Sequence, residues 1–98
     1  MSRPLTTTVN VQILDKEFLI NCPEEQRDEL IASARLLDQR MRQVKHSGKV
    51  YGLERIAVMT ALNLAHELLQ LQRDSEQVDR QARELTSKLE QVLNHDED

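Results

Sequence analysis

The segment His66-Glu67-Leu68-Leu69-Gln70 begins like the helix of a zinc peptidase, in which two histidines four residues apart bind the metal. Here Gln70 stands where the second histidine would be, so one of the two ligands is missing. The other histidines, His46 and His95, have no cysteine or acidic residue at a spacing typical of metal ligands. The sequence therefore predicts no metal site.

The sequence likewise predicts no nucleophilic catalytic site and no phosphate-binding loop. Cys22 is the only cysteine, has no histidine near it in the sequence, and is expected to be a small buried apolar side chain. A single cysteine allows no intramolecular disulfide and fits a reducing compartment. Gly48 and Gly52 are the only glycines, which leaves no glycine-rich phosphate loop. We therefore expect that the protein is not an enzyme.

The charges are unevenly distributed along the chain. The formal net charge is −4, yet residues 35–55 hold six bases and two acids, whereas residues 67–98 hold nine acids and four bases. The basic middle segment predicts a positively charged contact surface. It leaves open a small coiled-coil regulator that binds nucleic acid, although interleaved aromatic side chains are missing and the chain as a whole is acidic.

Two strands and a helix are predicted in the first half of the chain. Residues 8–13 and 17–22 alternate between polar and apolar side chains, and a short polar turn at residues 14–16 joins them into a hairpin without a turn glycine. Pro23 suits the first position of a helix. A helix of about twenty residues, ending before Ser47-Gly48, is then indicated by apolar residues that recur at spacings of four and three: Leu30, Ala34, Leu37, Met41 and Val44.

A second, longer helix is predicted from Leu53 almost to the C-terminus. From Ala57 to Val92 it carries an uninterrupted heptad seam, in which Ala61 and Ser75 are among the small members. A chain of 98 residues cannot bury a helix of this length against itself, so we expect copies to associate along the seam as a coiled coil. The predicted oligomerisation residues are Leu64, Leu68, Leu71, Val78, Ala82, Leu85, Leu89 and Val92.

These elements predict an α+β fold that is mainly α: an N-terminal β-hairpin, one shorter helix, and a long helix that ends in an oligomeric coiled coil. Residues 1–71 are expected to form a globular head that mediates dimerisation and partner contact. Residues 72–98 are expected to form a coiled-coil stalk with a frayed acidic tail from Asn94, and residues 1–6 a loose leader.

No membrane insertion is expected. No apolar run approaches the ~20 residues needed to cross a bilayer, and no hydrophobic signal segment opens the chain. The polar face of the long helix is acidic, where a helix lying on a membrane surface would be basic. We therefore predict a cytoplasmic protein.

The layout closely resembles the ZapA family of bacterial cell division proteins, which associate with the FtsZ ring. The resemblance covers nearly the whole chain and depends on the order and spacing of Asn21-Cys22-Pro23, Gln26-Arg27, Leu30, Ala61-Leu62-Asn63 and Glu67-Leu68. It implies a homodimer formed through the head and a dimer of dimers formed through an antiparallel coiled coil. Such a tetramer would bind FtsZ, cross-link and bundle its protofilaments, and stabilise the division ring at midcell, without enzymatic activity or a cofactor.

The resemblance also implies where FtsZ is contacted. The family uses a charged patch on the head, which maps in this sequence to Arg42, Lys45, Lys49, Glu54 and, in the hairpin turn, Lys16. Asp15 stands where the family commonly has glycine, and its charge weakens the case for Lys16 as a basic contact. Gln26 and Arg27 are instead expected to help assemble the head. A generic coiled-coil adaptor remains a further alternative.

Overall fold

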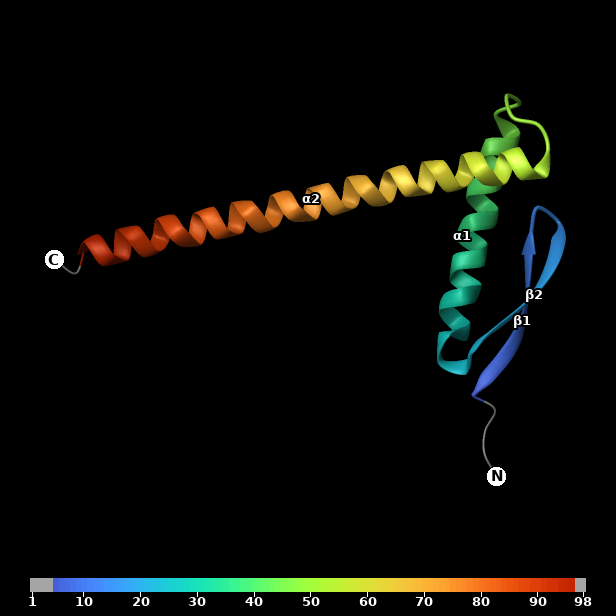
Figure 1. Ribbon diagram of the computed structural model, residues 1–98, viewed down its shortest axis with the longest axis horizontal. Coiled ribbons are helices and arrows are strands. Elements are labelled where there is room, and N and C mark those ends of the chain that lie inside the picture. The colour runs from blue at the N-terminus through green and yellow to red at the C-terminus, as the bar shows by residue number, and fades with distance from the viewer. Residues whose placement is uncertain (1–4, 97–98) are drawn as a thin grey trace. The chain divides into compact units, whose positions relative to one another are not determined.

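Alternating polar and apolar side chains build the hairpin at the start of the chain (Figure 1). The computed structural model describes residues 5–96, so the expectations for residues 1–4, 97 and 98 lie outside the described residues. Strands β1 (Thr6–Ile13) and β2 (Lys16–Pro23) are antiparallel, and Val9 faces Ile20 while Val11 faces Phe18. Each predicted strand is confirmed and is slightly longer than expected.

The hairpin turn consists of Leu14 and Asp15. Both residues have positive φ angles, 48° and 67°, which is the conformation of a tight type I′ hairpin turn. Such turns usually contain asparagine or glycine, because other residues are strained there. The predicted turn is confirmed with two residues, since Lys16 already pairs with Ile13 across the strands.

The first helix begins later than predicted. Pro23 has φ −57° and ψ 139°, which is extended backbone, and it pairs with Thr6 as the last residue of β2. The N–H of Glu24 then donates to the carbonyl of Leu5 at 3.2 Å, and a short 3₁₀ turn (Glu24–Gln26) precedes helix α1 (Arg27–His46). The prediction that Pro23 opens the helix is therefore wrong, because the strand pairing extends through this residue.

Helix α1 otherwise matches the prediction. It has 20 residues and ends before Ser47, and its five predicted apolar positions are all half-buried or buried. Figure 1 shows the hairpin running alongside α1, and both strands contact that helix. The apolar face of α1 therefore packs on the hairpin, as a two-stranded sheet requires for stability.

The second helix, α2 (Leu53–Asp96), begins where the sequence predicts. It remains helical as far as Asp96, so the predicted fraying from Asn94 is not seen in the described residues. By its internal contacts the chain divides into two compact units, with the boundary between Leu62 and Asn63. The predicted boundary at residue 71 separates a head for dimerisation and partner contact from a coiled-coil stalk. It is a division of function, and it stays a prediction.

The core of the first unit is small. In the described residues the buried hydrophobic side chains are Val9 and Val11 of β1, Met41 of α1 and Ile56 of α2. Thr60, one helical turn after Ile56 in α2, is also buried, and its hydroxyl donates to the carbonyl of Ile56 at 2.7 Å. This bond satisfies the one polar side chain that is buried in the described residues.

The second unit consists of the remainder of α2, and its apolar seam is exposed. The larger seam residues from Leu68 onward, together with Leu69 and Leu93, are between 52% and 66% exposed in the single chain. The fold class predicted from the sequence is confirmed as α+β and mainly α, whereas the coiled-coil assembly stays a prediction.

Truncating a core residue should destabilise the protein far more than truncating an exposed one on the same helix. We expect Met41→Ala to lower the free energy of unfolding by about 2–5 kcal/mol, because it leaves a cavity. Leu36→Ala, at a position that is 48% exposed, should cost less than about 1 kcal/mol. Urea denaturation at one fixed protein concentration measures both, and equal losses would contradict the assignment of the core.

Candidate functional site

The hairpin turn is tied to α1 by a network of charges. The backbone N–H of Leu14 donates to Oδ1 of Asp38 at 2.8 Å, and Nε of Arg42 donates to Oδ2 of the same carboxylate at 3.0 Å. A second nitrogen of Arg42 lies 2.9 Å from the carboxylate of Asp15 in the turn. The strained turn is therefore held by charge-assisted hydrogen bonds from the C-terminal half of α1.

These contacts shift the protonation equilibria of the groups involved. The pKa of the Asp38 carboxyl is lowered, first because it accepts the Leu14 N–H and then because it accepts from Arg42. The pKa of the Arg42 guanidinium is raised, first by its hydrogen bond to Asp15 and then by that to Asp38. Both groups are therefore charged at neutral pH, when the network is complete.

The end of α1 is capped by hydrogen bonds that also shape the connector to α2. The hydroxyl of Ser47 donates to the carbonyl of Val44 at 2.7 Å and accepts the N–H of Lys49 at 3.3 Å. Gly48 follows with φ 71°, the left-handed conformation that commonly ends a helix. Gly52 has φ 91°, and its carbonyl accepts the N–H of Ile56 at 3.0 Å, which starts α2.

The predicted cations Lys16 and Lys45 meet beside the hairpin turn. They line a shallow groove of about 250 Å³, which we call the lysine groove, together with Leu14, Gly52, Leu53 and Ile56. Within residues 5–96 neither lysine forms an ion pair. The lysine groove therefore presents two free positive charges next to the turn that Asp38 and Arg42 hold in place.

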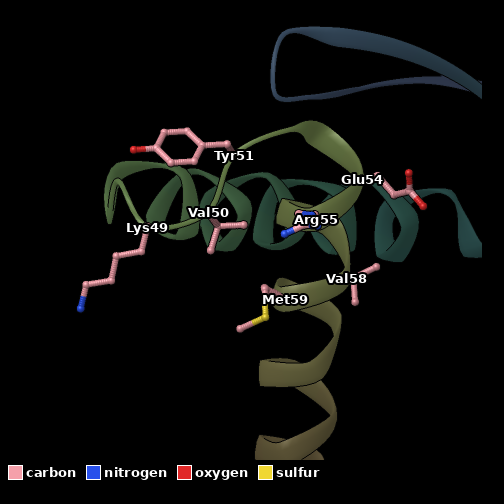
Figure 2. Close-up of a pocket in the computed structure, with 7 residues that line it drawn as sticks. All are labelled: Lys49, Val50, Tyr51, Glu54, Arg55, Val58 and Met59. Atoms are coloured by element: carbon pink, nitrogen blue, oxygen red, sulfur yellow. The ribbon is translucent and has the colours of Figure 1, made fainter.

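The predicted residues Lys49 and Glu54 line a second, larger groove of about 750 Å³ at the connector, which we call the joint groove (Figure 2). Its other members are Val50, Tyr51, Arg55, Val58 and Met59. Figure 2 shows the Arg55 side chain between Met59 on one side and Val58 and Glu54 on the other. Tyr51 is 79% exposed, so the joint groove combines apolar side chains with charges on an open surface.

The five residues predicted to contact a partner thus lie around the connector between α1 and α2, although their neighbouring side chains differ. Arg42 binds two carboxylates within the chain, so it also has a structural role. Sequence reasoning missed Asp38, whose spacing of four residues from Arg42 was a visible signal. It also missed the joint-groove residues Tyr51, Val58 and Met59, because exposure cannot be read from residue type.

The described residues contain no group of three or more His, Cys, Asp or Glu side chains that could hold a metal ion. Among the helices of residues 5–96, none combines the length and the apolar character that a membrane span requires. The site offers exposed charges and apolar side chains, which suit binding to another macromolecule.

Comparison with known proteins identifies relatives over nearly the whole chain. Residues 9–95 match the family described as cell division protein ZapA. Cell division protein ZapA of Pseudomonas aeruginosa strain PAO1 is 45% identical over 92 residues, which are 90% of this chain and 88% of that protein. Cell division protein ZapA of Mannheimia succiniciproducens is 35% identical over 89 residues, which are 87% of this chain and 83% of that protein.

A solved structure supports the same relationship. It is described as an unknown conserved bacterial protein from Pseudomonas aeruginosa PAO1 and is 45% identical in sequence to this chain. The two superpose with a TM-score of 0.65 over 86% of this chain and 97% of that chain. The similarity therefore extends from sequence to fold.

The turn network should make stability depend on pH. Because the pKa of Asp38 is lowered on folding, its contribution is present above the ordinary carboxyl pKa of about 3.9 and is lost as the pH falls through the folded value. We expect Asp38→Ala to lower the thermal unfolding midpoint at pH 7, with a difference from the parent that narrows in acid. Asp79→Ala, in α2, is the control, and a difference for Asp38→Ala that does not change with pH would contradict the network.

Proposed function

The chain belongs to the ZapA family of cell division proteins, and we propose that it binds FtsZ, cross-links and bundles FtsZ protofilaments, and stabilises the division ring at midcell. The proposed role is that of a non-enzymatic cytoplasmic scaffold. It needs two properties, self-association and a surface for FtsZ, which we assign to different parts of the chain.

The exposed seam of α2 is the observation that carries the proposal. Leu71, Val78, Leu85 and Leu89 are each more than half exposed in the single chain, at the heptad spacing that two helices bury between them. Leaving apolar surface exposed to water costs a free energy of about 25 cal/mol per Å². Association of copies along the seam would remove this surface from water.

The seam itself favours an antiparallel arrangement. Between Leu71 and Leu85 its small residues alternate with large ones, so a parallel pair in register would place Ser75 against Ser75 and Ala82 against Ala82, leaving poorly filled layers. In an antiparallel pair Ser75 of one copy can face Val78 of the other, and Ala82 can face Leu71. This agrees with the antiparallel dimer of dimers that the family resemblance implies.

Antiparallel association explains how weak contacts could bundle filaments. It would give each assembly several copies of the same FtsZ-binding surface, directed to more than one protofilament. Along a polymer, one bound surface raises the effective concentration of the next, so binding strengthens without any new contact. We assign the FtsZ surface to the joint, where Lys16, Lys45, Lys49 and Glu54 lie.

Charging the seam should separate bundling from binding. We expect Leu85→Asp or Leu89→Asp to dissociate the assembly, because each buries a charge in an apolar layer, and to abolish the light scattering of bundled FtsZ polymers. Binding of single heads to FtsZ should persist in co-sedimentation. Ser87→Asp, on the outer side of the same helix, is the matched control, and undiminished bundling by the seam variants would refute the proposal.

Reversing charges at the connector between α1 and α2 should impair FtsZ binding and spare self-association. We expect Lys45→Glu and Lys49→Glu to leave the oligomer intact and to weaken FtsZ co-sedimentation about threefold to tenfold, as losses of about 0.7–1.4 kcal/mol predict. Arg73→Glu, on α2 away from both grooves, should leave binding unchanged. Normal co-sedimentation of the lysine variants would remove these residues from the FtsZ surface.

A further inference from the structure

We propose that the joint groove receives a short acidic segment of the partner protein that also carries an apolar side chain. In this arrangement the apolar side chain packs against Met59, which lies on the side of Lys49 and Val50 (Figure 2), and the carboxylates bind Lys49 and Arg55. The inference rests on the proposed function for the identity of the partner, FtsZ. It adds the chemistry of the segment recognised and three residues, Tyr51, Arg55 and Met59, to the contact surface.

The joint groove has the mixed character of a protein-binding surface. Tyr51, Val58 and Met59 are 79%, 53% and 40% exposed, and all three line the joint groove together with Lys49, Glu54 and Arg55. Tyrosine and arginine are the residue types that most often dominate the energy of protein interfaces. A nucleic-acid duplex would present mainly phosphates to the groove and leave its apolar side chains uncovered, and this favours a peptide segment with an apolar side chain over a duplex.

The charges of the joint groove specify an acidic occupant. Within the part of the chain that the structure describes, neither Lys49 nor Arg55 forms an ion pair. Among the described residues that line the groove, Glu54 is the one acid, and it lies with Val58 on the side away from Lys49 (Figure 2). A segment that enters from the side of Lys49 therefore meets two unpaired cations, and carboxylates complement them.

The joint groove stays accessible when copies pair along the seam. Arg55 and Met59 stand two residues before and two residues after the seam residue Ala57. At ~100° per residue they point about 160° around the helix from Ala57. A helix that packs on the seam therefore does not cover Arg55 or Met59, whereas Val58, about 60° around the helix from the seam residue Ala61, borders that contact.

The groove is also largely preformed. Ser47 bonds both the last turn of α1 and the N–H of Lys49, and the carbonyl of Gly52 accepts the N–H of Ile56. These bonds fix the connector at both ends, so Val50 and Tyr51 are presented by an ordered backbone. A partner segment then loses less binding energy to ordering the groove.

Two substitutions separate the apolar and the charged contributions. Co-sedimentation of the full chain with FtsZ polymers is measured from low to high salt for Arg55→Ala, Met59→Ser and the control Arg73→Ala. We expect both groove variants to bind about tenfold more weakly than the parent, as the loss of a central interface residue predicts. Binding by Arg55→Ala should depend less steeply on salt, whereas Met59→Ser should keep the salt dependence of the parent.

The outcomes distinguish this inference from the proposed function. If the parent does not co-sediment with FtsZ, the proposed function fails and the inference fails with it. If the parent binds and both groove variants bind equally well, only the inference is overturned. It is also overturned if Arg55→Ala loses affinity for a DNA or RNA duplex in a gel shift while it keeps its affinity for FtsZ, because the groove would then serve nucleic acid. Molar mass measured by light scattering should be the same for all variants.

Discussion

The exposed apolar seam of α2 is the constraint on which the rest of the molecule depends. In the described residues the hydrophobic core consists of four side chains, Val9, Val11, Met41 and Ile56, and all of them belong to the first unit. Full burial of one large aliphatic side chain is worth about 1.5–3 kcal/mol. The seam offers more such side chains than the core contains, so pairing of copies would add more apolar burial than the single chain achieves. In the proposed scaffold, stability would therefore come largely from the assembly of copies.

Self-association and partner binding are assigned to different faces of the chain. The seam residues follow one side of α2, whereas Arg55 and Met59 of the joint groove lie nearly opposite Ala57 on the same helix. On the hairpin side, Asp38 and Arg42 hold the strained Leu14-Asp15 turn in place and so fix the position of Lys16 beside Lys45. Because the two proposed functions are assigned to separate side chains, we expect that a variant can lose one and keep the other.

Most of the fold could be predicted from the sequence because its signals are local. The alternation in residues 8–13 and 17–22, the stop at Ser47-Gly48 and the heptads after Ala57 each reflect the geometry of one element. Pro23 was assigned to the wrong element, because cross-strand pairing with Thr6 outweighed its preference for a helix start. Most of the site residues came from the resemblance to a family, whereas Tyr51, Val58 and Met59 were missed, because their exposure depends on how the connector meets α2. The bond from Leu14 to Asp38 joins residues 24 apart, which spacing within one element cannot reveal.

The molar mass of the purified full chain against concentration tests the central claim most directly. Size-exclusion chromatography with light scattering gives this mass without FtsZ or any other partner. Association along the seam predicts values well above the 11.4 kDa of one chain, with a further rise as concentration increases if two interfaces of different strength are present. A well-folded chain that remains at 11.4 kDa at high micromolar concentration would contradict the account.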